Sequence, residues 1–86
     1  MLVMFKANWF GPSRMIEAHF DAYEGKFHGK SECVFAKVDI DENDDLATEL
    51  GVNVTPTFQV WKGGEKVEEL VGADATGLKA LVEKYV

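Results

Sequence analysis

The chain has 86 residues, 47% of them hydrophobic, and a formal net charge of −6 with nine basic residues. This length makes one domain, residues 1–86, and the acidic balance excludes sequence-independent nucleic-acid binding, which needs clustered Lys and Arg. No run reaches the about 18 apolar residues of a membrane span, and the single cysteine excludes a disulfide framework and favours a cytoplasmic protein.

The N-terminal third predicts a strand followed by a helix. Residues 2–7 are apolar enough for a buried strand. Pro12 suits the first turn of a helix, where its missing N–H would be unpaired anyway. Residues 28–30 end this helix, and its apolar face is formed at helical spacing by Ile16, Phe20, Tyr23 and Phe27.

The middle of the chain predicts a second strand and a short helix. Residues 33–38 are rich in side chains that favour strands. We expect Asp44 or Asp45 to cap a short helix that runs through Leu50, and Gly51 to end it.

The C-terminal third predicts a hairpin and a last helix. Residues 57–61 alternate as a third strand, residues 62–65 make a tight turn with two glycines, and residues 66–71 return antiparallel. We expect Thr76 to cap the last helix, whose apolar face holds Leu78, Leu81, Val82 and Tyr85. A right-handed β-α-β start followed by a hairpin predicts a four-stranded mixed sheet covered by helices.

Several short segments resemble the thioredoxin family, in order and at family-like spacing. Trp9-Phe10-Gly11-Pro12-Ser13 resembles the family's Trp-Cys-Gly-Pro-Cys loop with both cysteines replaced. Weaker likenesses, strong only together, lie at Val38 to Asn43, Val54 to Phe58, Lys62 to Gly64 and Gly72-Ala73. The resemblance implies an α/β, N-terminally shortened thioredoxin fold with helices on both faces of a four-stranded mixed sheet, and a cis Thr55–Pro56 bond.

The groups that perform the family's chemistry are missing. Thiol–disulfide exchange needs an attacking thiolate and a second thiol to resolve the mixed disulfide, but Phe10 and Ser13 supply neither. Met4 stands where catalytic thioredoxins usually carry a buried aspartate. The main hypothesis is therefore a redox-inactive protein, with no cofactor, that binds protein or peptide partners in a groove formed by Trp9, Phe10, Gly11, Pro12, Ser13, Thr55, Pro56, Gly72 and Ala73.

Two alternatives stay open beside this hypothesis. The chain is either a divergent thioredoxin-type protein-disulfide oxidoreductase of cell redox homeostasis, with Cys33 as a lone thiol, or a structural, oligomerising subunit. The resemblance implies that a strand and a helix of the family are absent before Leu2, which exposes the edge of strand 33–38 and apolar surface on one sheet face. That edge predicts a homodimer or a strand-exchanged oligomer, unless the sequence is a fragment or a shortened gene model.

Individual residues also have two interpretations each. Trp9 is either a peptide anchor or a packing residue at the rim, and Phe10 either enlarges an exposed apolar patch or folds inward. Pro56 either shapes a retained peptide-binding groove or only shapes the turn that leads into the third strand. Cys33 is either a small buried hydrophobe or a reactive thiol near the bare edge.

No metal site is expected. His19 and His28 share no ligand spacing with Cys33. The acidic stretch from Asp39 to Glu49 imitates part of a calcium loop, but its sixth position is Asp44 instead of glycine and its twelfth is Leu50 instead of glutamate.

Overall fold

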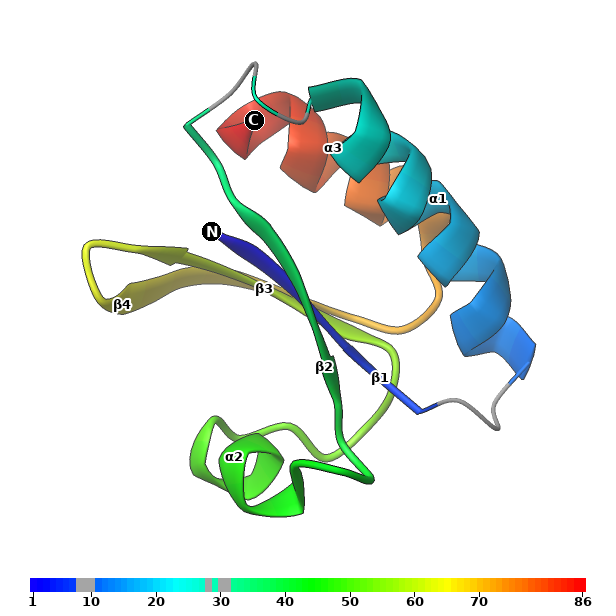
Figure 1. The fold of residues 1–86 in the computed structure, drawn as a ribbon, viewed down its shortest axis with the longest axis vertical. Coiled ribbons are helices and arrows are strands. Elements are labelled where there is room, and N and C mark those ends of the chain that lie inside the picture. The colour runs from blue at the N-terminus through cyan, green and yellow to red at the C-terminus, as the bar shows by residue number, and fades with distance from the viewer. Residues whose placement is uncertain (8–10, 28, 30–31) are drawn as a thin grey trace.

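A computed structural model describes residues 1–7, 11–27, 29 and 32–86, with the backbone alone for residues 11–13. In this part of the chain, strands and helices follow one another in the predicted order (Figure 1). The elements are β1 (Leu2–Lys6), α1 (Gly11–Phe27), β2 (Phe35–Asp39), α2 (Asp44–Glu49), β3 (Thr57–Lys62), β4 (Glu65–Val71) and α3 (Ala75–Tyr85).

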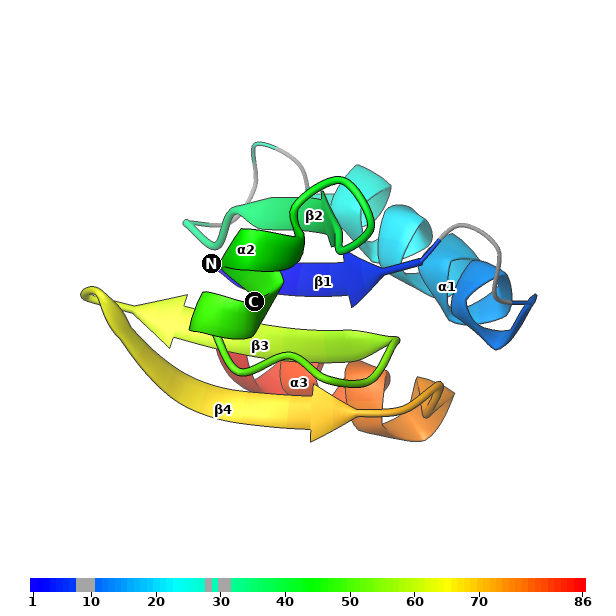
Figure 2. The ribbon, with the colours of Figure 1, turned by 90° about the horizontal axis from the view of Figure 1, so that it is seen from below.

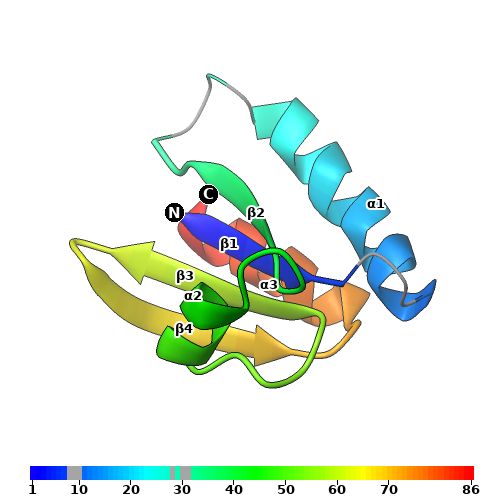
Figure 3. The same cartoon turned by 60° about the horizontal axis from the view of Figure 1, so that its bottom comes forward.

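The four strands form one mixed sheet in the order β2-β1-β3-β4. β1 pairs in parallel with β2 and antiparallel with β3, and β3 continues into the antiparallel hairpin with β4. Figures 2 and 3 show β2 and β4 at the two edges of the sheet. The hairpin turn forms as predicted, because Gly63 and Gly64 adopt φ values of 61° and 80° that other residues rarely reach.

Helices cover both faces of the sheet, as the fold class predicts. α1 and α3 lie on one face and α2 on the other (Figures 1 and 2). Successive side chains of a strand point to opposite faces, so Leu2 and Met4 enter the core under α1 and α3, whereas Val3 and Phe5 enter the smaller core under α2. Full burial of each such side chain stabilises the fold by about 1.5–3 kcal/mol.

The predicted bounds of the second strand are wrong at both ends. Pairing with β1 runs from Phe35 opposite Leu2 to Asp39 opposite Lys6. Cys33 and Val34 precede the strand, because β1 begins at Leu2 and offers no further residue in that register. Val34 is 57% exposed.

The predicted helix caps are also wrong. Asp44 and Asp45 lie inside the first turn of α2, after the cap position Asn43, which makes no side-chain cap bond and instead donates its Nδ2–H to the Asp39 carbonyl. The cap of α3 is Asp74, whose Oδ1 accepts the Gly77 N–H at 2.9 Å, because the capping residue must precede the first helical residue. Thr76 lies within α3.

Candidate functional site

The residues predicted to form a groove include the segment between the end of β1 and the first turn of α1. β1 ends at Lys6 and α1 starts at Gly11, at the same end of the sheet (Figure 2). Trp9 and Phe10 lie outside the described residues. Gly11, Pro12 and Ser13 form the first turn of α1, one residue earlier than predicted.

Two other predicted parts of the groove lie together at this end of the sheet. The Thr55–Pro56 peptide bond is cis. The Pro56 carbonyl accepts the Gly72 N–H at 2.9 Å, which joins the proline segment to the glycine turn. Thr57, the next residue, pairs with Phe5 near the end of β1, and Ala73 is exposed beside Gly72. The structure therefore brings together Thr55, Pro56, Gly72 and Ala73 at the end of the sheet where β1 ends.

Met4 supplies no acid or base to this region. Its side chain is 0% exposed and packs in the core with Phe20 and Phe58. Its register partner on β2, Lys37, also faces α1, where Nζ donates to Asp21 Oδ1 at 2.8 Å and to Glu17 Oε2 at 3.0 Å. Lys6 Nζ bonds the same Glu17 oxygen at 2.8 Å.

This charged cluster shifts two pKa values. Partial burial raises the pKa of Glu17, but the hydrogen bonds from Lys6 and Lys37 outweigh burial and hold it below 4.5. The hydrogen bond to Asp21 raises the pKa of Lys37 above 10.5, against partial burial, with Glu17 adding in the same direction. Both shifts favour the charged forms, so the cluster ties α1 to β1 and β2 at neutral pH.

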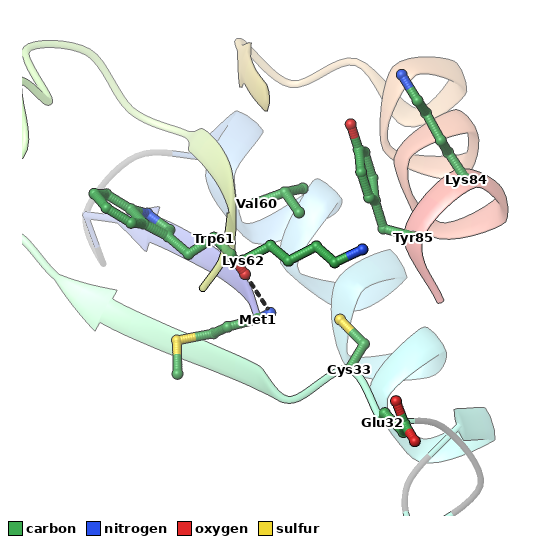
Figure 4. A pocket seen from close by; sticks show the side chains of 8 residues that line it. All are labelled: Met1, Glu32, Cys33, Val60, Trp61, Lys62, Lys84 and Tyr85. Atoms are coloured by element: carbon green, nitrogen blue, oxygen red, sulfur yellow. Dashed lines mark hydrogen bonds between the residues drawn. The ribbon is translucent and has the colours of Figure 1, made fainter. Parts of the chain in front are cut away.

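Cys33 lies at the other end of the sheet from the groove. It is partly exposed and lines a pocket of about 300 Å³ with Lys62, Tyr85 and other residues (Figure 4). Leu2 donates its N–H to the Val34 carbonyl, so Cys33 stands beside the beginning of β1. A strand rises about 3.3 Å per residue, and the length of β1 therefore places about 15 Å between Cys33 and the end that α1 follows.

An apolar hollow lies on the α2 face of the sheet. Its volume is about 290 Å³, and its lining residues are Met1, Val3, Phe5, Ala36, Val38, Leu46, Leu50 and Trp61. Ala36 and Val38 belong to the edge strand 33–38 predicted to self-associate, whereas no functional role was predicted for the other lining residues. Two spacings in the sequence indicate which of these side chains share a face. Ala36 and Val38 alternate with Lys37 along a strand, and Leu46 and Leu50 are one helical turn apart.

The described residues hold no group of three or more His, Cys, Asp or Glu side chains arranged to bind a metal ion. The acids of the calcium-like stretch have a structural role instead. Asp39 Oδ1 accepts the N–H groups of Asp41 and Glu42, at 2.9 and 3.4 Å, in the turn before α2. Among the described helices, none has the length and apolar character to cross a membrane.

A family model described as thioredoxin matches residues 1–84. The chain belongs to the thioredoxin family. It is 44% identical over 84 residues to a thioredoxin of Coprinus comatus, across 98% of this chain and 78% of that relative.

Solved structures show the same relationship. A thioredoxin of Fasciola hepatica superposes with a TM-score of 0.89 at 34% identity, across 99% of this chain and 79% of the other. A second match has a TM-score of 0.85 at 31% identity. It comes from a structure that describes the thiol-resolving mechanism of yeast mitochondrial 1-Cys peroxiredoxin via glutathione and thioredoxin systems. That match covers 96% of this chain and 76% of the other.

Proposed function

We propose that this thioredoxin-family protein binds protein or peptide partners in the groove beside Pro56 and does not exchange disulfides through it. The observation that carries the proposal is the position of the only cysteine. Cys33 precedes β2, about 15 Å along the sheet from the end where a thioredoxin dithiol would lie, and Phe10 and Ser13 occupy the dithiol positions of the sequence.

The chemistry explains why that position matters. One thiolate attacks the partner's disulfide and forms a mixed disulfide while the other partner sulfur leaves, and a second thiol must then attack to release the reduced partner. A single Cys33 thiol takes the first step only and leaves the partner attached. Release would need an added low-molecular-weight thiol.

The groove keeps the parts that recognise a chain without reacting with it. The Pro56 carbonyl and the Gly72 N–H hold two backbone segments side by side at the end of the sheet. Thr55, beside them, is partly exposed, and an extended peptide could pair with its backbone by main-chain hydrogen bonds. Trp9 and Phe10 would add apolar contact area, as aromatic side chains do at interfaces.

Titration with the carboxymethylated B chain of insulin, an extended peptide without free thiols, tests the groove. We expect saturable shifts of the backbone amide signals of Thr55 and Gly72, and at least a tenfold loss of affinity in Ala73→Arg. Ala80→Arg, at an exposed alanine on α3, is the matched control and keeps the wild-type affinity. Equal binding by both variants would contradict a partner groove here.

A second candidate function is that of a thioredoxin-type oxidoreductase in cell redox homeostasis. The family relationship favours it more directly than it favours a redox-inactive protein, because the relatives carry the name thioredoxin. Cys33 is the one thiol available for it, and its pocket is open to solvent. Exchange with a small disulfide that disappears in Cys33→Ser would support this function over the first.

Two further expectations stay predictions. A cytoplasmic location rests on the single cysteine and is tested by imaging a tagged protein. Self-association is predicted through the edge strand at residues 33–38. These residues overlap β2 and include Ala36 and Val38, which line the apolar hollow.

A further inference from the structure

A further pocket adjoins the groove beside Pro56, at the edge of the sheet that β4 forms. Its volume is about 200 Å³, and its lining residues are Gly51, Asn53, Val54, Thr57, Glu69 and Val71. Figures 2 and 3 show the segment that follows α2 running past β4 to the start of β3. The pocket therefore lies between this segment and the end of β4.

Both walls of this pocket run directly into the groove. On one wall, Val54 lies two residues before Pro56. On the other, Val71 precedes Gly72, whose N–H is donated to the Pro56 carbonyl. Thr57 pairs with Val71 across the hairpin and donates its hydroxyl group to the Val54 carbonyl at 2.6 Å, which ties the two walls together. A peptide bound beside Pro56 therefore has a neighbouring side chain at the mouth of this pocket.

The pocket combines exposed apolar walls with one carboxylate. Val54 is 54% exposed and Val71 is 55% exposed, so their burial against a bound side chain would stabilise a complex. Glu69 is the only charged residue among the described residues that line the pocket. A side chain that satisfies both features has an apolar stem and a cationic head, as Lys and Arg do.

Glu69 has capacity for a further hydrogen-bond donor. Its Oε2 accepts from Gln59 Nε2 at 2.8 Å and from Lys66 Nζ at 3.3 Å, whereas no described residue donates to its Oε1. Gln59 is buried and also bonds Leu50 and Trp61, so it holds the carboxylate in place. The pair with Lys66 joins side chains that are 38% and 32% exposed. Such a surface pair contributes little in water, and a cation of a partner can compete with it.

Arginine fits this acceptor better than lysine does. Its guanidinium group is planar, carries several N–H donors in a fixed arrangement and is more weakly hydrated than an ammonium group. It can therefore donate to Glu69 Oε1 while the Lys66 ammonium group stays at Oε2, because a carboxylate accepts several hydrogen bonds.

From these features we propose that the pocket binds an arginine side chain of the peptide that lies in the groove beside Pro56. The methylene stem of the arginine contacts Val54 and Val71, and its guanidinium group donates to Glu69. This inference rests on the proposed peptide-binding groove and adds the residue type by which the groove selects its partners.

Titration of the full chain with acetyl-Ala-Val-Arg-Val-Ala-amide tests the proposal. Two matched peptides carry citrulline, the neutral analogue of arginine, or leucine at the central position. We expect the arginine peptide to bind about fivefold more tightly than either of them. The amide signals of Thr55 and Gly72 report binding in the groove, and those of Val54 and Val71 report occupation of the pocket.

The two proposals fail in different ways in this experiment. Saturable shifts at Thr55 and Gly72, with equal affinity for the three peptides, would overturn the arginine pocket and leave the groove intact. Binding of the leucine peptide that is tighter than that of the arginine peptide would assign the pocket to an apolar side chain and overturn it too. If none of these peptides and not even the insulin chain shifts Thr55 and Gly72, the groove itself is contradicted, and the pocket proposal with it.

Two substitutions on β4 remove the same charge at different places. Glu69→Gln should reduce the preference for arginine over citrulline to below about twofold, while the new amide still offers Gln59 an acceptor. Glu65→Gln, at an exposed residue at the other end of β4, should keep the full preference. A preference that persists in Glu69→Gln, or that both variants lose equally, would overturn the assignment to this carboxylate.

Two lysine substitutions test the competition at the carboxylate. Lys66→Gln removes the competing cation and should strengthen binding of the arginine peptide about twofold. Lys62→Gln, at an exposed residue at the end of β3, should leave it unchanged. Equal strengthening by both variants would show a general effect of charge and overturn direct contact with Glu69.

Discussion

Lys37 Nζ donates a hydrogen bond to Asp21 Oδ1 at 2.8 Å, and this contact joins the edge strand β2 to α1. Its neighbour Glu17 accepts from Lys37 and from Lys6 at one oxygen, Oε2. Three elements thus meet in one charged cluster. Lys37 and its register partner Met4 both face α1, Lys37 through this cluster and Met4 through the core that includes Phe20.

The first prediction concerns the pH dependence of this cluster. The pKa of Glu17 is lower in the folded state than its ordinary 4.5, so its contribution to stability is present above pH 4.5 and is lost as the pH falls through the folded pKa. Lys37 has a raised pKa, so its contribution is present below pH 10.5 and is lost above it. Urea unfolding of Glu17→Gln should show a loss of about 1 kcal/mol at pH 7 that shrinks as the pH falls below 4.5 and the carboxylate takes up a proton in the folded state.

Glu83→Gln is the control for that prediction. Its carboxylate lies 3.9 Å from Lys79 Nζ, and the side chains of both residues are about two-thirds exposed, at 67% and 66%. Such a pair contributes little in water, and we expect a change below about 0.3 kcal/mol. A Glu17→Gln deficit that is the same at pH 3 and pH 7 would contradict the electrostatic account.

A second prediction concerns Met4, which is fully buried. Met4→Asp places a carboxyl group in the apolar core and should lower the free energy of unfolding by about 4 kcal/mol at pH 7. Burial favours the neutral acid, so the deficit should shrink by up to about 1.4 kcal/mol per pH unit between pH 7 and pH 5. Met4→Leu, which keeps the volume, should cost less than about 1.5 kcal/mol. A deficit independent of pH would show that the new carboxyl reaches solvent.

A third prediction concerns Gln59, whose side chain is 0% exposed. Its Nε2 donates to the Leu50 carbonyl and to Glu69, and its Oε1 accepts the Trp61 Nε1–H at 2.9 Å. Gln59→Leu removes these bonds and should cost about 2 kcal/mol, because buried partners lose their hydrogen bonds. In a double-mutant cycle with Trp61→Phe, calorimetry should give a coupling of about 1 kcal/mol, and additive losses would refute the network.

Most of the fold was predictable because its signals are local. The face of α1 with Ile16 and Phe20 lies in the core, and so do Leu78, Leu81 and Val82 of α3. Gly63 and Gly64 make the turn that their pairing predicts. The caps were not predictable, because Asp44, Asp45 and Thr76 carry the same chemistry as true caps. Only the surrounding backbone decides which residue precedes the first helical turn.

The surroundings of single side chains were predictable only in part. Alternation along β3 is typical of a strand with one polar face, yet Gln59 is buried, since α2 and Glu69 cover that face. The meeting of Pro56 with Gly72 was expected from the family resemblance, not from periodicity. The pairing of Lys37 with Glu17 and Asp21 depends on the packing of α1 over the sheet, which no local pattern encodes.

Insulin reduction in the presence of dithiothreitol tests the central claim most directly. The wild-type protein should give no turnover above the blank, whereas Phe10→Cys/Ser13→Cys, which restores the family's Cys-Gly-Pro-Cys sequence, should reduce insulin. Wild-type turnover that is lost in Cys33→Ser would contradict the claim and make the protein an oxidoreductase that uses Cys33.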